Sequence, residues 1–102
     1  MLKIAVIGDS DTAVGFRLAG ADAFEANSLD EGERILKHVL SQDDVGVIII
    51  TKELAKGLAK LIEEVEKKGL PIIVVIPGST EIIDIPSLSE YVGELFGFGH
   101  IS

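Results

Sequence analysis

The chain has 102 residues, of which 47% are hydrophobic and 25% are charged, a length and composition typical of one compact domain. Its 17 acidic residues exceed its 9 basic ones, and the net charge of -8 argues against nucleic acid or an anionic lipid surface as a partner. There is no cysteine, which excludes disulfides, thiolate metal sites and cysteine nucleophiles. No apolar run approaches a membrane span and no secretory signal is visible, so we expect a single cytoplasmic domain over residues 1–102.

The first part of the chain predicts a strand, a helix and a shorter strand. Residues Leu2–Ile7 form an apolar run rich in β-branched residues, which is typical of a strand buried on both faces. Residues 12–19 have a helical pattern that ends at Gly20, a residue type that commonly terminates helices. The segment Asp22–Ala26 is too short and too polar for a central strand, so we expect it at the edge of a sheet.

The middle of the chain predicts a second helix and a central strand. Ser28 and Glu31 have the spacing of a capping box, which opens a helix. The apolar residues that follow recur at helical spacing and predict one buried face: Leu29, Gly32, Leu36, Val39 and Leu40. Residues 45–51 are then an almost continuous hydrophobic run, as expected for a strand at the centre of a parallel sheet.

The remaining pattern predicts a long helix, a fourth strand and a last helix. The segment Lys52–Lys68 has an apolar stripe at helical spacing and is predicted as one continuous helix. Residues 71–77 predict the fourth strand, and residues 78–86 form a loop between two prolines. Ser87 then begins a short C-terminal helix that extends to about residue 96.

Strands that alternate with helical crossovers predict an α/β fold with a parallel sheet and right-handed connections. We expect a four-stranded sheet with the order 2-1-3-4 and helices on both faces, similar to half of a Rossmann fold or to flavodoxin. The sheet and its helices would occupy residues 1–80, and a C-terminal loop, helix and tail would occupy residues 81–102.

Ligands of such folds usually bind beyond the carboxyl ends of the strands. The residues expected at that rim are Asp9, Ser10, Asp11, Thr51, Gly78, Ser79 and Thr80. The acidic pair could hold Mg²⁺, as paired acids do in receiver domains, but the third strand ends in Thr51 where a receiver has its acidic phosphoacceptor. The favoured interpretation is structural, with Asp9 and Asp11 capping the first helix.

Nucleotide binding and catalysis find little support in the sequence. The loop from Gly8 to Gly15 has two glycines rather than the three of a dinucleotide fingerprint, and its carboxylates would repel phosphates. His38 and His100 have no evident nucleophile or orienting acid beside them, and the GxSxG motif is absent. We therefore predict no catalytic residue, no cofactor and no metal ligand.

The C-terminal stretch is rich in aromatic residues. The candidates for binding a protein partner are Tyr91, Leu95, Phe96 and Phe98. Aromatic side chains on a terminal helix can complete the core, or they can anchor a protein interface. Both interpretations stay open for Phe96 and Phe98, whereas completion of the core is favoured for Leu95.

The segment KIAVIGDSDTAVGFRLAGADAFEA resembles the opening of the central-stalk F subunit of V-type and archaeal A-type rotary ATPases. The matching positions of this signature are Gly8, Asp9, Asp11, Thr12, Gly15, Phe16, Leu18, Ala19 and Gly20. The resemblance continues through VGVIIITKELA and through IIDIPS, and it covers nearly the whole chain.

This resemblance implies a non-catalytic rotor component without a cofactor. The partners that it implies are the coiled-coil D subunit of the central stalk and other rotary ATPase subunits. It also implies a role in coupling ATP synthesis or hydrolysis to proton or sodium transport, at the cytoplasmic side of the membrane. The alternative is a receiver-like domain that senses a nucleotide or Mg²⁺ through Asp9 and Asp11.

Overall fold

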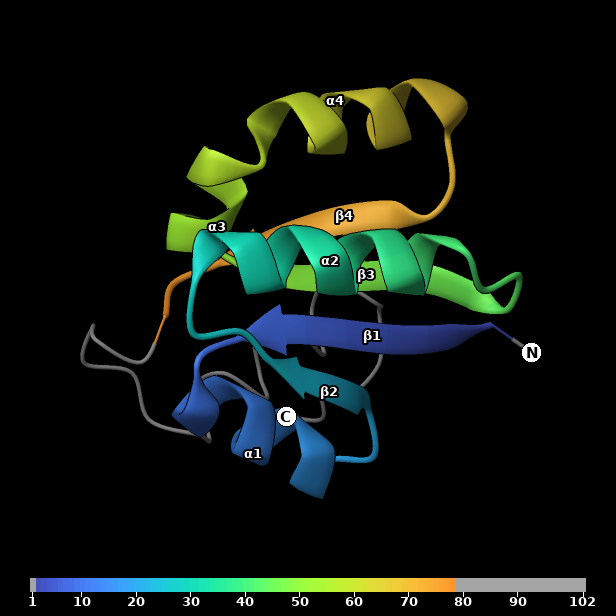
Figure 1. Cartoon of the computed structure of the whole chain (residues 1–102). Helices are drawn as coiled ribbons and strands as arrows, with labels where there is room; N and C mark the ends of the chain where they lie inside the picture. Colours follow the sequence, from blue (N-terminus) through green and yellow to red (C-terminus); the bar gives the residue numbers. More distant parts are fainter. Residues whose placement is uncertain (1, 79–102) are drawn as a thin grey trace, which may run out of the picture.

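The computed structural model describes residues 2–78 of the chain. In chain order the elements are β1 (Lys3–Gly8), α1 (Ser10–Leu18), β2 (Asp22–Glu25), α2 (Leu29–Leu40), β3 (Val45–Thr51), α3 (Lys52–Gly57), α4 (Ala59–Lys68) and β4 (Ile72–Ile76) (Figure 1). The predicted C-terminal helix and its aromatic residues lie outside this range. No helix within residues 2–78 is long and apolar enough to cross a membrane.

The four strands form one parallel sheet with the order β2-β1-β3-β4, and the predicted fold class and strand order are confirmed. β2 lies at an edge, as its short polar sequence predicts. Helices cover both faces: α2 crosses in front of the sheet in Figure 1, and α1 packs on the opposite face beside β1 and β2. β3 is therefore covered on both faces, which explains its almost continuous apolar sequence.

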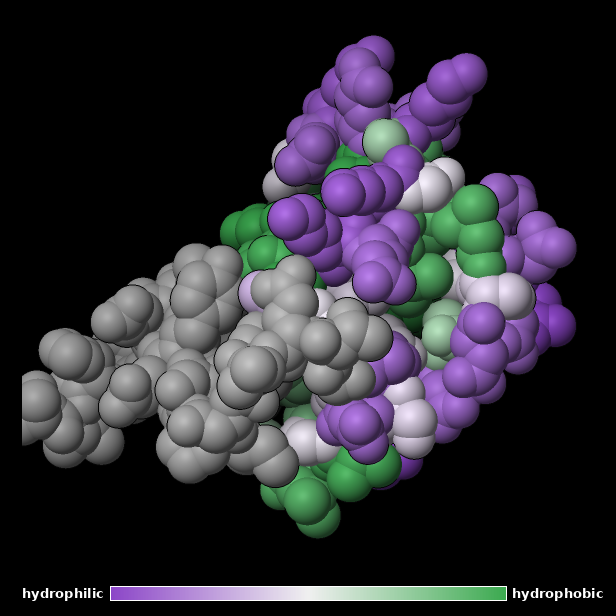
Figure 2. Space-filling model, turned by 90° about the vertical axis from the view of Figure 1, so that its left-hand side faces the viewer, coloured by the Kyte–Doolittle hydropathy of each residue, from purple (hydrophilic) through white to green (hydrophobic). Residues whose placement is uncertain are grey.

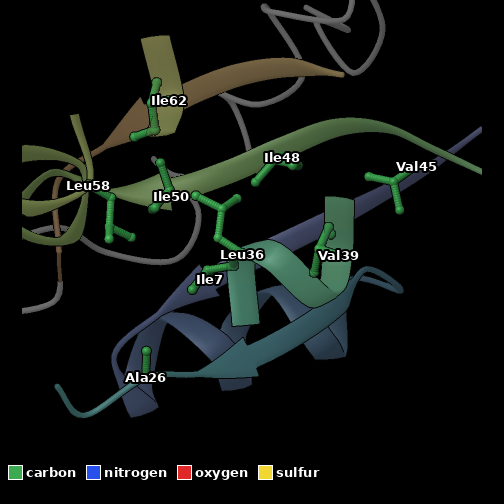
Figure 3. Packing of buried hydrophobic residues seen from close by; sticks show 10 residues of the cluster. Ile7, Ala26, Leu36, Val39, Val45, Ile48, Ile50, Leu58 and Ile62 are labelled. Atoms are coloured by element: carbon green, nitrogen blue, oxygen red, sulfur yellow. The ribbon is translucent and has the colours of Figure 1, made fainter. Parts of the chain in front are cut away.

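Two hydrophobic clusters hold these layers together. The larger one joins the sheet to α2 and α4, with side chains such as Leu36, Ile50 and Ile62 converging between them (Figure 3). The smaller one places Phe16 of α1 against the other face of the sheet, over Ile49. Ile49 and Ile50 point to opposite faces of the sheet and are both 0% exposed. β3 therefore packs against the helices on both faces.

The predicted cap of α2 is confirmed, with a shift of one residue in the return bond. The Ser28 hydroxyl accepts a hydrogen bond from the Glu31 backbone N–H at 3.2 Å. The Glu31 carboxylate accepts in turn from the backbone N–H of Asn27 at 2.8 Å, rather than from that of Ser28. The two bonds satisfy polar groups that would otherwise be left open where the helix begins.

The prediction of one helix over Lys52–Lys68 is wrong, because the chain forms α3 and α4 with a break at Leu58. The backbone there has φ of -109° and ψ of 21°, outside the helical region. Gly57, a weak helix former, precedes the break, and a Cβ at this position would stand 2.8 Å from Leu29 Cδ2. The apolar period continues across the break because Leu58 itself is buried, and so the pattern alone does not reveal it.

The first helix begins at Ser10, two residues before the predicted start. Its predicted end is confirmed, since Gly20 follows the helix with a φ of +97° that favours glycine.

Two ion pairs connect the amino ends of the strands. Lys3, the first residue of β1, pairs with Asp22 of β2 at 3.2 Å and with Asp44, directly before β3, at 3.3 Å. Hydrogen bonds to these carboxylates raise the pKa of Lys3.

Candidate functional site

A pocket of about 330 Å³ lies at the carboxyl ends of the strands. Residues that follow each of the four strands line it: Asp9 after β1, Asn27 and Ser28 after β2, Glu53 after β3 and Gly78 after β4. Figure 2 views the molecule from this end, where hydrophilic residues (purple) predominate and hydrophobic areas (green) lie between them and at the lower edge. This is the place where open α/β sheets bind ligands, because the chain leaves β1 and β3 toward opposite faces.

Asp9 lies in the pocket at the start of α1, but its carboxylate does not cap the helix as predicted. Asp9 occupies the N-cap position, and its side chain makes no hydrogen bond to the backbone of the first turn. Its Oδ1 instead accepts from the Thr12 hydroxyl at 2.7 Å. The reason is that Thr12 is only 5% exposed, and its buried hydroxyl requires an acceptor.

The structure separates the two members of the predicted acidic pair. Asp9 lines the pocket, whereas Asp11 is exposed in the first turn of α1 and is not among the lining residues. Asp11 is at the helix end where a negative charge is favourable, as predicted. Within residues 2–78 no group of three or more histidine, aspartate or glutamate side chains is placed to hold a metal ion.

Thr51 is the most deeply buried polar residue of the pocket lining. It is 4% exposed and occupies the N-cap position of α3, yet its hydroxyl does not cap that helix. Its methyl group packs toward Gly8, where a Cβ would stand 2.7 Å from Thr51 Cγ2. The glycine at the end of β1 thus lets two neighbouring strand ends approach closely.

The sequence pattern identifies some pocket residues and misses others. Thr51 and Gly78 lie at the expected rim, but Asn27, Ser28 and Glu53 are not among the predicted site residues. Their signal is their position after a strand, because such segments of a parallel sheet all lie at the same edge, but the sequence does not indicate which of them line a pocket there. The sequence predicts Ser28 as a helix cap, a role that it also performs.

The two histidines and the C-terminal candidates lie away from this pocket or outside the described residues. His38 is exposed on α2, with its ring edge-on to Phe24 at a centroid distance of 6.3 Å. The candidates outside the described residues are Ser79, Thr80, Tyr91, Leu95, Phe96, Phe98 and His100.

Comparison with known proteins gives a consistent result across the whole sheet. The model of the family described as "ATP synthase (F/14-kDa) subunit" matches residues 4–92. The F subunit of the A-type ATP synthase of Pyrococcus furiosus is 49% identical over 81 residues, covering 74% of this chain and 75% of that protein. The F subunit of the A-type ATP synthase of Archaeoglobus fulgidus is 39% identical over 87 residues, covering 83% and 86%.

A solved structure agrees with these sequence matches. The crystal structure of the F subunit of the V-type ATP synthase from Archaeoglobus fulgidus superposes with a TM-score of 0.66 at 38% identity. The match covers 74% of this chain and 96% of the solved one. Sequence and fold therefore point to the same group of proteins.

Proposed function

Because the chain belongs to the family of ATP synthase F subunits, and is therefore a component of a rotary ATPase, we propose that it is a non-catalytic part of the central stalk. In this proposal it binds the coiled-coil D subunit and helps to couple ATP synthesis or hydrolysis to proton or sodium transport. It would do so on the cytoplasmic side of the membrane. The family match over residues 4–92 carries the proposal. It includes all four described strands, apart from Lys3, the first residue of β1.

The packing of the sheet supports a mechanical role. Three consecutive residues at the centre of β3, Ile48 to Ile50, are 0% exposed and pack into clusters on both faces. Close-packed interiors deform little, because a change of volume by even one methylene is resisted. A part of a rotating shaft needs this property, since a compliant component would absorb torque rather than transmit it.

Exposed apolar residues near β4 support binding of a protein partner. Leu70 is 60% exposed, Ile72 is 53% exposed and Val75 is 43% exposed. All three lie in or just before the edge strand β4 of the described sheet. Ile72 and Val75 lie on opposite sides of this edge, because successive strand residues alternate between the two faces of a sheet. Apolar side chains exposed along a sheet edge are available to a protein partner.

The direct test is co-expression with the D subunit of the same organism, followed by gel filtration at low and high salt. We expect the two proteins to elute together in both conditions, because apolar contacts persist when salt screens the charges. An unrelated coiled coil serves as the control and should elute separately. Separate elution of this chain and the D subunit at every salt concentration would overturn the proposal.

The aromatic residues predicted as partner contacts lead to a further prediction. We propose that Tyr91, Leu95, Phe96 and Phe98 contribute to the interface with the D subunit. A chain that ends at residue 96 should then bind the D subunit more weakly, with little change in its melting temperature, because Phe98 would be lost from the interface rather than from the core. Calorimetry and thermal unfolding measure the two effects. A large drop in melting temperature would assign the segment to the core.

The alternative function is a receiver-like sensor of a nucleotide or Mg²⁺. The observation in its favour is the position of Asp9 in the pocket at the carboxyl ends of the strands. Titration calorimetry with MgCl₂ and with ATP distinguishes the two functions. Binding in the millimolar range or tighter would favour the sensor, whereas the stalk component needs neither ligand.

A further inference from the structure

The pocket at the carboxyl ends of the strands is lined by acidic but not by basic side chains of residues 2–78. Asp9 and Glu53 contribute carboxylates from two different segments, and no lysine or arginine is among the described residues that line the pocket. The chain as a whole has a net charge of -8, which adds to the negative potential. A positively charged group is therefore attracted to this pocket.

The Thr51 hydroxyl is a second polar group that a ligand in the pocket could reach. Thr51 is 4% exposed, and within residues 2–78 its hydroxyl has no hydrogen-bond partner. Among the described residues, every side-chain nitrogen or oxygen that is shielded from solvent has a hydrogen-bond partner. The Thr51 hydroxyl oxygen has none among these residues, and it is therefore open to solvent. Since Thr51 lines the pocket, the pocket is the place where a ligand would reach this oxygen.

Anions and metal ions fit this arrangement poorly. The start of α2 is a poor phosphate site, because the Glu31 backbone N–H already donates to the Ser28 hydroxyl and the first turn contains the acidic residues Asp30 and Glu31. Mg²⁺ prefers six oxygen ligands, and no cluster of three acidic or histidine side chains is found among the described residues. A cation that brings its own apolar portion is a better match.

Apolar residues and glycines shape the rest of the pocket. Leu29 and Leu54 supply apolar walls, and Gly78 lines the pocket without a side chain. A Cβ at position 78 would stand 3.5 Å from Asp9 Oδ1 and 3.9 Å from Thr51 Cβ, so a side chain there would fill the space between these two groups. Lysine and arginine bury their methylene stems against apolar walls while the charged end reaches polar groups.

We propose that this pocket receives a lysine or arginine side chain of the D subunit, bound between the carboxylates of Asp9 and Glu53 and the hydroxyl of Thr51. This rests on the proposed function, because the D subunit supplies the side chain. The donated hydrogen bonds go to carboxylate and hydroxyl oxygens, which all accept. The pocket is thus a specificity contact that orients the two proteins.

The test uses titration calorimetry, at low and high salt, to measure how tightly variants of the full chain bind the purified D subunit. Gly78→Leu fills the pocket and Glu53→Lys reverses its charge, and each should raise the Kd about tenfold or more. Glu63→Lys, a charge reversal at another exposed glutamate, on α4, is the matched control and should change the Kd less than about twofold. The Glu53→Lys effect should shrink at high salt.

Thr51→Val keeps the shape of the side chain, removes the hydroxyl and should weaken binding several-fold with an unchanged circular dichroism spectrum. It keeps the proposal testable if the bulkier variants fail to fold. If the unmodified chain does not bind the D subunit, the proposed function itself fails. If it binds and Gly78→Leu, Glu53→Lys and Thr51→Val bind equally well, or if Glu63→Lys weakens binding as much as Glu53→Lys, the pocket is not the contact, and the proposed function stands.

Discussion

Leu36→Ala is expected to lower the free energy of unfolding by about 3 kcal/mol, within the range of about 2–5 kcal/mol for truncation of a buried leucine. Leu36 is 0% exposed and lies on the face of α2 that packs against the sheet, near Ile7 and Ile50 (Figure 3). Alanine is the better helix former, so the loss cannot come from the helix itself. It comes from the cavity that the missing side chain leaves between α2 and the sheet.

Equilibrium unfolding in urea, followed by circular dichroism, measures this effect. The matched control is Leu18→Ala at the end of α1, where the leucine is 81% exposed and the expected change is below about 0.5 kcal/mol. Because a small domain has only about 5–15 kcal/mol of stability, the Leu36 variant should also melt at a visibly lower temperature. A loss below about 1 kcal/mol would mean that α2 contributes little to the core.

Gly8→Ala is expected to lower the free energy of unfolding by about 1–3 kcal/mol, because it overpacks the end of β1. The new Cβ would stand 2.7 Å from Thr51 Cγ2 and 3.2 Å from Thr12 Cγ2. Both threonines are at most 5% exposed, so their methyl groups have little room to move away from the new Cβ. Backbone shifts at the joined ends of β1 and β3 must then relieve the contact.

A double-mutant cycle tests this cause. Thr51→Ser removes Cγ2, the nearest atom, and keeps the hydroxyl that lines the pocket. In that background Gly8→Ala should cost less than in the unmodified chain, with a coupling of at least about 0.5 kcal/mol in urea unfolding. Additive effects of the two substitutions would show that contact with Thr51 is not the source of the loss.

Most of the fold can be predicted because its signals are local. The β-branched run of β3, the cap at Ser28 and the glycine at position 20 each specify the conformation of a few neighbouring residues. Right-handed crossovers then leave few ways to order four parallel strands. The break at Leu58 is not predictable in this way. Leu58 is buried, so the apolar residues recur at the same helical spacing before and after the break as they would in one continuous helix.

The candidate site can be predicted only in part. Asp9 and Thr51 stand directly after or at the end of strands, and the sequence alone therefore indicates the rim on which they lie. The partner of Asp9 does not follow from the sequence, because the choice between a backbone N–H and the Thr12 hydroxyl depends on how deeply Thr12 is buried. Glu53 and Asn27 come from segments that the sheet brings together from distant parts of the chain.

The sequence by itself determined the element types, the absence of cysteine chemistry and the family signature around Gly8, because these depend on residue identity and short-range spacing. Only the tertiary structure decided that Asp9 enters a pocket while Asp11 remains outside it. It also decided that Glu53 and Thr51 share that pocket with Asp9. The physical reason is that the direction and burial of a side chain are properties of the packed sheet, and the local pattern that predicts the strands does not encode which side chains at their ends will share a pocket.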